Sequence, residues 1–499
     1  MVRPQDDIVV TGPDPRRWRA LVLLCVAFFM VILDAQIVIL ALPSIEADLE
    51  MSPNAGQWVM SAYLLSFGGL LLLAGRSADL LGRRRMFMVG TALFLVSSLG
   101  CGLAWSGGAL TAMRVVQGVS ASIMAPTALS ILINAFDEGA ERTKALGVWS
   151  AVGGIGATAA LLIGGPLTDG PGWRWIFFIN IPVALAMLAL SPRLLRESRE
   201  QTKDRIYDVT GAVTITAALV LLVYAVVRTP DFGWLAPQTT AVLAASVLLI
   251  GAFVLVEQRS SSPIVPLRIF RSAPLVGGNL ALLVLGMGAW GMSLTLSSYA
   301  QQVLGYSAVE FGLGTAVMTV GAVVGSMAGQ ALVTRVGPSV IGGAGFLFIA
   351  AGMIVLTQVA ADGSFLHDIL IGLLLFGPGL GATYVAASVA TLAGVDERQT
   401  GLAAGLNNAA FQIGGAFGSA VVTTVAVSTS DGRLSPTGLT EGFQSAFASA
   451  ITFPVLGFLC VVLLLTRRRA SSHRAQPPPS EPADRQSARL SRPAPTCRQ

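Results

Sequence analysis

The amino-acid sequence predicts an all-α polytopic membrane protein with about 14 transmembrane helices. Three observations support this fold class. Hydrophobic residues make up 54% of the chain and charged residues 12%, whereas a typical soluble protein has about 25% charged residues. The apolar residues form long segments that can each cross a hydrocarbon core of about 30 Å as a helix. The arginines gather in alternate gaps between these segments, as positive charge does in cytoplasmic loops.

The apolar segments define the expected helices in chain order. The first runs from Ala20 to Leu42, after the basic residues Arg16 to Arg19, and the others are bounded in the same way by charged or turn-forming residues. After the sixth span, the charged stretch from Ser191 to Asp208 is expected to lie at the cytoplasmic interface. The expected spans are 20–42, 57–74, 86–104, 110–135, 145–168, 175–192, 209–227, 238–256, 274–300, 309–330, 338–359, 365–393, 401–427 and 445–466.

The charge distribution predicts an orientation in the membrane. One set of gaps holds arginines such as Arg76 and Arg85, and the other set holds mostly acids such as Asp48 and Asp231. Both termini are therefore expected on the cytoplasmic side. The preference for Arg over Lys indicates a bacterial chain, so the expected location is a bacterial cytoplasmic (inner) membrane. Topology accounts for most of the net charge of +5, so this charge does not predict a nucleic-acid partner.

The number of spans suggests a division into six, two and six helices, with the two sets of six as matched halves around a central binding site. The last segment is rich in Pro, Ser and Arg and cannot bury enough apolar surface to fold, so we expect it to be disordered. The expected units are a cytoplasmic N-terminal tail (1–19), a six-helix bundle (20–195), a two-helix insert with cytoplasmic linkers (196–272), a second six-helix bundle (273–466) and a cytoplasmic tail (467–499).

Asp34 is an acidic residue inside the first span. Counting back from Pro43 at ~1.5 Å per residue places it about 13 Å below the outer end of the helix. An acid at such a depth costs about 2.5–3.5 kcal/mol on insertion scales, and such residues are usually functional. A carboxylate whose partner changes with conformation can load and release a proton, which a proton-coupled carrier requires. The alternative is a structural acid paired with a neighbour.

Arg114 is the expected neighbour of Asp34, because it lies about 6 Å inside the outer end of the fourth span. Its long side chain can span the difference in depth, so an ion pair is expected. The alternative is an arginine that extends to the outer interface. Gln117 and Gly118 follow one turn later.

The loop after the second span forms a third constellation, Gly75-x3-Asp79-x2-Gly82-Arg83-Arg84-Arg85. Glycines allow tight turns and close helix contact, and Asp79 precedes a helix whose dipole favours an anion. These residues are expected to form a charged latch on the inner face. Ordinary positive flanking of a membrane span is the alternative for the arginines.

Proton-motive force is the expected energy source, by elimination. A phosphate-binding P-loop needs Gly-Lys-Ser/Thr, but Lys144 precedes Ala and Lys203 precedes Asp. No ATP site, metal site or other cofactor is therefore predicted. The two histidines are His367 and His473, and no nucleophile–base spacing appears, so an enzyme is not predicted.

Five segments match motifs in order along the chain: Leu33 to Pro43, Gly75 to Arg85, Arg114 to Gly118, Gly172 to Pro182, and Tyr299 to Ser307. Together they resemble the 14-helix drug:proton antiporter branch of the major facilitator superfamily (multidrug exporters), over almost the whole chain except the tail. The resemblance implies the major facilitator fold, with two pseudo-symmetric six-helix bundles. It also implies that Asp34 carries the proton or meets a cationic drug, that Arg114 assists, and that Asp79 with Arg83 controls gating.

The sequence departs from the family pattern in the fifth span. The antiporter motif ends here as Ala160 to Gly165 without its usual Gly-Pro pair, which leaves antiport itself open. Pro166 and the glycines before it are expected to bend this helix instead. The residues assigned to helix packing or bending are Gly118, Gly156, Gly164, Gly165 and Pro166.

Aromatic, Met and amide side chains in the spans suggest a cavity for varied apolar ligands, although core packing explains them equally well. The candidate lining residues are Gln36, Trp58, Tyr63, Met124, Trp149, Trp290, Tyr299, Asn407, Asn408 and Gln412. Gln36 stands where the first-helix motif usually has Thr.

The expected function is proton-driven efflux of amphipathic or cationic drugs by alternating access of two bundles. The expected partners are such small molecules, protons and the lipid bilayer, with the chain acting as a monomer. One alternative is a dedicated exporter of a single antibiotic or metabolite made by the same cell. A more remote alternative is a transport-inactive membrane sensor that signals through its tail.

Overall fold

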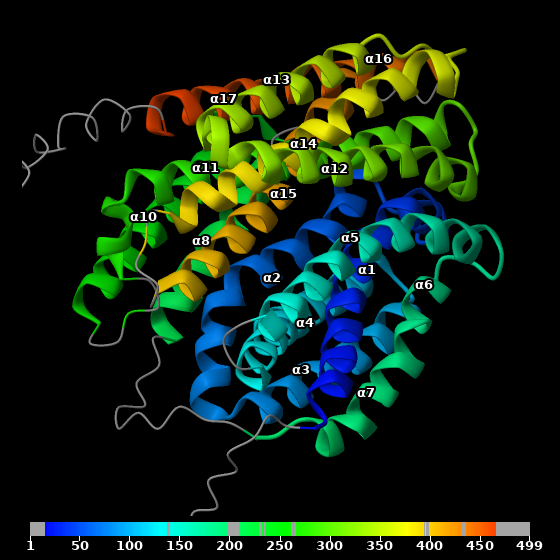
Figure 1. Cartoon of the computed structure of the whole chain (residues 1–499). Helices are drawn as coiled ribbons and strands as arrows, with labels where there is room; N and C mark the ends of the chain where they lie inside the picture. Colours follow the sequence, from blue (N-terminus) through cyan, green and yellow to red (C-terminus); the bar gives the residue numbers. More distant parts are fainter. Residues whose placement is uncertain are drawn as a thin grey trace, which may run out of the picture.

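A computed structural model describes residues 15–136, 140–197, 209–228, 232–233, 235–260, 263, 266–393, 395, 399–430 and 436–465. These residues are almost entirely helical, and no strand occurs among them. Figure 1 shows two groups of helices, one drawn in blue to cyan-green and one in green to orange. The predicted disordered tail, 467–499, lies outside the described residues.

The N-terminal bundle consists of α1 to α7, each of which overlaps one span predicted from the sequence. Two of these helices start at a serine cap: the hydroxyl of Ser52 accepts a hydrogen bond from the Ala55 N–H, and Ser106 does the same for Ala109. The bounds are α1 (Arg17–Asp48), α2 (Pro53–Leu81), α3 (Arg83–Gly102), α4 (Gly107–Ala135), α5 (Ala140–Asp169), α6 (Trp175–Phe178) and α7 (Asn180–Leu194).

The C-terminal bundle repeats this arrangement. Ser307 and Glu310 form a capping box at the start of α12, in which each side chain bonds the backbone N–H of the other. The α-helical bounds are α11 (Ala273–Gln302), α12 (Ala308–Val336), α13 (Pro338–Leu356), α14 (Leu370–Leu392), α15 (Thr400–Thr429), α16 (Pro436–Ala450) and α17 (Thr452–Cys460). π-Helical turns extend two of these spans, with η2 (Phe365–Ile369) before α14 and η4 (Val461–Leu465) after α17.

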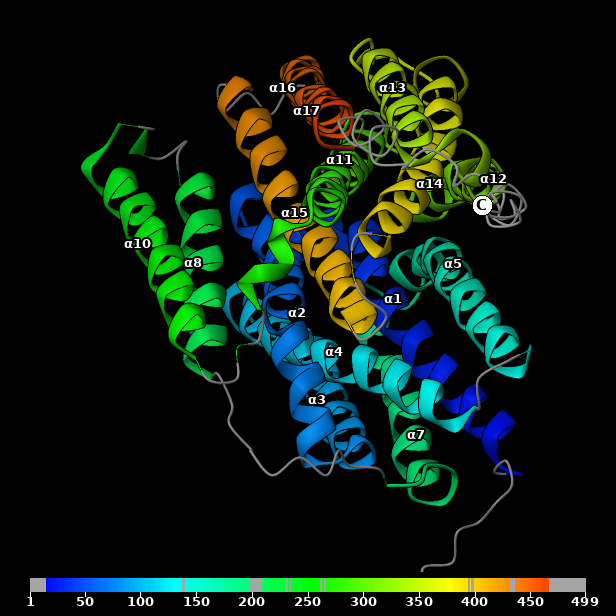
Figure 2. The same ribbon diagram turned by 60° about the vertical axis from the view of Figure 1, so that its left-hand side comes forward.

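In the sequence between the two bundles, α8 (Val209–Val227) and α10 (Pro237–Arg259) form an antiparallel pair. Figure 2 shows this pair on the left, beside α2 and α15. It contacts the two bundles through α8, which packs against both α2 and α15. The hydroxyl of Ser246 in α10 donates to the Ala218 carbonyl of α8, 2.8 Å away, and so joins the pair at its buried face.

Each of the predicted spans corresponds to one helix or to consecutive helical segments. Eleven helices among the described residues are long and apolar enough to cross a membrane by length and composition. α2 and α5 are not among these eleven, and α8 contributes only a shorter apolar stretch, Val213–Ala225. The chain is therefore an all-α multi-pass membrane protein, and the total of 14 crossings stays a prediction.

The two bundles meet along α2 with α15 and along α5 with α12. We call the end of the molecule that carries Asp48 and Asp169 the predicted outer end, because the charge pattern assigns its loops to the outside. There, the Asp169 carboxylate accepts hydrogen bonds from the first N–H groups of α12, Ala308 at 3.3 Å and Val309 at 3.0 Å. This contact joins the outer ends of α5 and α12.

Glycines let several helices approach backbone to backbone. A Cβ built on Gly286 of α11 would lie 2.1 Å from the Phe411 carbonyl oxygen of α15. A Cβ on Gly325 of α12 would lie 2.1 Å from the Pro378 oxygen of α14. Real side chains do not tolerate such distances, so these contacts require glycine. In a bilayer, small residues stabilise helix association through this close packing.

Candidate functional site

Asp34 and Arg114 form a buried ion pair inside the N-terminal bundle. Arg114 Nη1 lies 2.7 Å from Asp34 Oδ2, and both residues are fully buried. Asp34 comes from the middle of α1 and Arg114 from the outer part of α4. The arginine therefore does not extend to the interface, which was the alternative considered from the sequence. Removing either partner would leave the other charge buried and uncompensated.

Two amide side chains complete the shell around the carboxylate. Gln117 Nε2 and Asn180 Nδ2 each donate to Asp34 Oδ1 at 2.9 Å. Both amides also donate to the hydroxyl oxygen of Ser98 in α3, at 2.9 Å from Gln117 and 3.2 Å from Asn180. Gln117 Oε1 in turn accepts from Arg114 Nη1 at 2.7 Å. The carboxylate thus receives donors from two helices, α4 and α7.

Arg114 is also held from its other side. Its Nε donates to the Val59 carbonyl of α2 at 3.0 Å, and its guanidinium lies 4.2 Å from the ring centroid of Tyr63. The Tyr63 hydroxyl donates to the Val31 carbonyl of α1 at 3.2 Å. Such a cation–π contact adds about 2 kcal/mol when it is desolvated. The charged cluster, defined as Asp34, Ser98, Arg114, Gln117 and Asn180 with Tyr63, therefore links α1, α2, α3, α4 and α7.

Sequence reasoning assigned roles to only part of this cluster. Asp34 and Arg114 were expected to meet, whereas Asn180 appeared only within a family motif and Ser98 not at all. The detectable feature was a polar residue at each of these positions within otherwise apolar spans. A buried amide must find a partner, but the sequence does not say which one.

The loop after α2 contacts a residue that the sequence analysis did not single out, Glu197. The Arg84 backbone N–H donates to Glu197 Oε1 at 3.1 Å, and Arg84 and Arg85 lie near Glu197 Oε2, each with a 3.8 Å distance from Nε. Gly82 has φ 108°, and a Cβ there would lie 2.6 Å from Glu197 Oε1. Glycine at this position thus permits both the turn and the carboxylate contact.

The remaining residues of the predicted latch are Gly75, Asp79 and Arg83, and the described part of the structure shows fewer contacts that bear on their predicted role. Gly75 lies in α2, where a Cβ would meet only Pro126 of α4 at an ordinary 3.7 Å. Arg83 begins α3. The backbone of Asp79 lies in α2, but its side chain is outside the described part of the structure. Its role in gating therefore stays a prediction.

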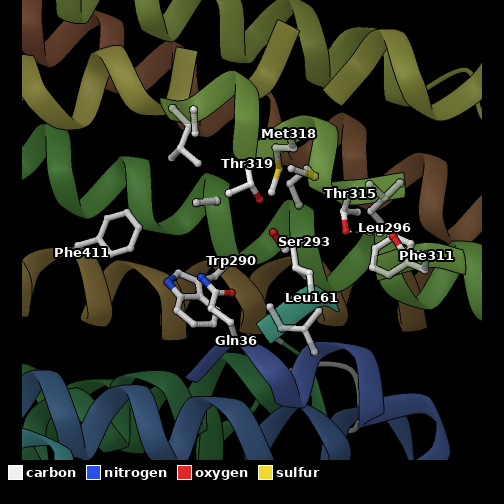
Figure 3. Close-up of a pocket in the computed structure, with 15 residues that line it drawn as sticks. Gln36, Leu161, Trp290, Ser293, Leu296, Phe311, Thr315, Met318, Thr319 and Phe411 are labelled. Atoms are coloured by element: carbon white, nitrogen blue, oxygen red, sulfur yellow. Dashed lines mark hydrogen bonds between the residues drawn. The ribbon is translucent and has the colours of Figure 1, made fainter. Parts of the chain in front are cut away.

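A central cavity of about 140 Å³ lies between the bundles. Figure 3 shows Gln36 and Leu161 from the N-terminal bundle on one side, with Ser293 of α11 and Met318 of α12 above them and the Trp290 ring of α11 beside Gln36. Most of the lining is apolar, and the polar groups are a few hydroxyls and the Gln36 amide. An apolar cavity with a few fixed polar groups suits amphipathic small molecules.

Of the predicted cavity residues, only Gln36 and Trp290 are among those that line this cavity. The remaining eight do not line this cavity, so a role in cargo binding stays a prediction for Trp58, Tyr63, Met124, Trp149, Tyr299, Asn407, Asn408 and Gln412. Trp149, for example, stacks on Phe28 with ring centroids 4.2 Å apart. The Tyr299 hydroxyl donates to the Ala360 carbonyl at 2.7 Å. Large side chains in apolar spans also fill cores, and the sequence does not separate the two uses.

The predicted packing glycines lie at helix contacts. A Cβ on Gly118 of α4 would lie 2.4 Å from the Tyr63 carbonyl oxygen of α2. Gly156 and Gly164 place α5 against Ile32 and Ile37 of α1.

The end of the same helix contacts the other bundle. A Cβ on Gly165 would lie 2.5 Å from Val309 Cα of α12. α5 continues without a break through Pro166 to Asp169. The bend predicted at this proline stays a prediction. Among the described residues, no three or more His, Cys, Asp or Glu side chains are grouped as metal ligands would be.

Comparisons with known proteins agree with this architecture. A family model described as Major Facilitator Superfamily matches residues 24–419 and 279–495. The puromycin resistance protein pur8 of Streptomyces alboniger is 38% identical over 469 residues, which cover 92% of this chain and 93% of that protein. The cephamycin export protein CmcT of Amycolatopsis lactamdurans is 38% identical over 439 residues, with coverages of 87% and 90%.

The likeness extends to solved structures. The crystal structure of the POT family transporter PepTSo has a TM-score of 0.65 and 14% identity to this chain, with coverages of 91% of this chain and 98% of that one. At that identity the likeness concerns the fold alone. The family model and the two relatives each cover most of the sequence, and the chain therefore belongs to the Major Facilitator Superfamily.

Proposed function

We propose that this protein is a proton-driven exporter that exchanges protons for amphipathic or cationic drugs by alternating access. The observation that carries the proposal is the buried ion pair of Asp34 with Arg114 in the middle of a membrane-spanning bundle. Ionisable residues are rare at such depth and commonly belong to proton or substrate pathways. Proton-motive force is the proposed energy source, with no cofactor.

Protonation of Asp34 would change the balance of forces in the N-terminal bundle. A neutral Asp34 no longer compensates Arg114, and an uncompensated buried charge costs about 3–5 kcal/mol. The bundle would then favour a conformation in which Arg114 reaches water or another acceptor. In the described conformation the pair is sealed from water, so proton exchange belongs to another conformation of the transport cycle.

α1 connects the charged cluster to the central cavity, where the cargo is proposed to bind. Asp34 and Gln36 lie on the same helix, and Gln36 lines the central cavity. A shift of α1 that follows protonation would therefore alter the cavity wall. The cavity is mainly apolar, which supports amphipathic cargo rather than strongly hydrophilic molecules.

The proposed location is a bacterial cytoplasmic membrane, with both termini in the cytoplasm. The asymmetric arginine distribution supports this orientation. The connected polar cluster lies within a single chain, which supports a monomer as the transporting unit. The contact of Asp169 with α12 then joins the bundles on the outer face.

A dedicated exporter of one antibiotic is the second candidate. The names of the relatives pur8 and CmcT each refer to a single antibiotic, puromycin for pur8 and cephamycin for CmcT. Competition among chemically unrelated compounds separates the two candidates, since a dedicated exporter should ignore most of them.

The test of proton coupling is Asp34→Asn in inverted membrane vesicles. We expect substrate-driven proton release to disappear, because the substituted amide cannot exchange a proton. Proton release at the wild-type level would remove Asp34 from the coupling role. Glu441→Gln, at an exposed acid on α16, is the matched control and should leave proton release unchanged.

A further inference from the structure

A second cavity, which we call the outer pocket, lies between the bundles at the predicted outer end. It has a volume of about 200 Å³. α1 and α2 supply Glu46 and Gln57, and α11 supplies Ser298 and Gln302. α15 and α16 add a largely apolar wall that includes Phe443. Gln302 is exposed, so the pocket reaches the surface on this side.

The outer pocket is separate from the central cavity. Along α1, the central cavity ends at Ile39 and the outer pocket begins at Leu42. Between them, the Ser297 hydroxyl of α11 donates to the Ile39 carbonyl at 2.9 Å. This hydrogen bond closes the bundle interface between the two cavities.

Glu46 places a carboxyl group in the outer pocket. It is the one ionisable residue among the residues that line the pocket, and no basic side chain lies among them. Its carboxylate rests against the first turn of α2, since a Cβ built on Gly56 would overlap Glu46 Oε1. The positive end of the α2 dipole favours an anion at that place. The carboxyl group therefore lies in the pocket wall beside the start of α2, where a bound cation would stabilise its charged form.

Gln57 adds an acceptor that lacks a partner. This side chain is 1% exposed, and its Nε2 donates to the Ser61 hydroxyl. Its Oε1 is buried and has no hydrogen-bond partner within the described part of the chain. A buried acceptor without a partner costs free energy that a bound donor recovers. The pocket wall thus presents one carboxyl group and one acceptor without a partner, beside an apolar surface.

We propose that the outer pocket is a second binding site, which takes the protonated amine of an amphipathic molecule. The ammonium group donates to the Glu46 carboxylate and to Gln57 Oε1, and the apolar part of the molecule packs against α15 and α16. This inference deepens the proposed export function and rests on it, because the site lies where cargo would leave. It assigns the carrier a preference for amines at the exit side.

The test is equilibrium binding of a matched pair of small probes to the purified full-length protein in lipid nanodiscs. The probes are 4-phenylbutylamine, which is protonated at neutral pH, and 4-phenyl-1-butanol, which is not. Calorimetry, corrected with empty nanodiscs, gives both affinities. We expect the wild type to prefer the amine by about tenfold, as a charge-assisted hydrogen bond provides. The variant Glu46→Gln should lose this preference.

Two control variants test whether the preference for the amine arises in the outer pocket. Glu441→Gln removes an exposed acid of α16 outside the pocket and should keep the preference. Trp290→Ala alters the central cavity and should also keep it. The proposal is overturned if Glu46→Gln keeps the preference, if Trp290→Ala abolishes it, or if the wild type does not bind the amine more tightly than the alcohol. Binding at equilibrium needs no proton gradient, so this result is independent of the Asp34→Asn test.

Discussion

Asp34 and Gln36 lie two residues apart on α1 and serve opposite sides of that helix. Asp34 belongs to the charged cluster inside the N-terminal bundle, whereas Gln36 lines the central cavity between the bundles. Residues at i and i+2 point about 200° apart around an α-helix. A rotation of α1 that changes one environment must therefore change the other. The proton site and the cavity are joined mechanically through a single helix.

The ion pair predicts that the stability losses caused by substituting Asp34 and Arg114 are not additive. Arg114→Gln leaves the Asp34 carboxylate buried without a cation, and we expect a loss of about 3–5 kcal/mol. The double variant Asp34→Asn with Arg114→Gln removes both charges and should recover much of that loss. Thermal unfolding of the purified proteins in detergent measures both effects. Arg174→Gln, in an exposed ion pair with Asp48, is the control and should cost about 1 kcal/mol or less. Simple additivity in the double variant would contradict the prediction.

Asn180 is predicted to be a positioning residue for Asp34. Asn180→Ala removes a donor 2.9 Å from the carboxylate, which should cost about 1–3 kcal/mol of stability and reduce proton-coupled transport. Unfolding and vesicle transport assays check the two parts. Asn134→Ala is the matched control, because that amide is exposed and donates to the Ser130 carbonyl of its own helix. If both variants behave alike, Asn180 has no special part in the cluster.

Gly165 is predicted to control the distance between α5 and α12. In Gly165→Ala the new Cβ would lie 2.5 Å from Val309 Cα, a backbone atom that cannot move by a rotamer change. The helices should separate at the predicted outer end, and export should fall. Spin labels at the exposed positions Leu162 of α5 and Leu313 of α12 report the distance between the two helices.

The control for this prediction lies in the same helix. Gly147→Ala places a Cβ where nothing lies within 4 Å, so neither the label distance nor the transport rate should change. An unchanged label distance in Gly165→Ala would show that the contact adapts without separating the helices.

Gly82 is predicted to be required by the backbone of the inner loop. Its φ of 108° is unfavourable for any residue with a Cβ, and Gly82→Ala would also clash with Glu197. We expect a stability loss of about 1–3 kcal/mol. The matched substitution Gly251→Ala, in an open helical position of α10, should be neutral or slightly stabilising. Chemical denaturation compares the two, and equal stabilities would refute the assigned strain.

The positions of the helices could be predicted from apolar length and charge alone. The expected span 274–300, for example, corresponds to α11 at Ala273–Gln302. The second span was placed at 57–74, yet α2 continues to Leu81. The apolar pattern ends where polar residues begin, but a helix can extend beyond the hydrocarbon core. Hydropathy therefore locates the membrane crossing more accurately than the helix end.

The side-chain partners could be predicted only where a charge stood alone in an apolar span. Asp34 and Arg114 were such charges, and the high free-energy cost of burying an unpaired charge limited their possible partners. Glu197 lay in a charged stretch, where composition favours no particular partner, and its contact with Arg84 depends on the tertiary fold. Trp149 and Trp290 have the same chemistry, yet one stacks in the core and the other lines the cavity. Shape complementarity decides that difference.

The glycine contacts between α11 and α15, and between α12 and α14, constrain how this sequence can diverge. Gly286 and Gly325 each face a carbonyl oxygen of the neighbouring helix at a distance that admits no larger residue. Exposed side chains such as Val320 and Leu332 on α12 meet no comparable restriction. Substitutions should therefore be tolerated more easily at the exposed positions of the helices than at these glycines. New cargo specificity must arise by exchanging cavity residues within an almost invariant spacing of the helical backbones.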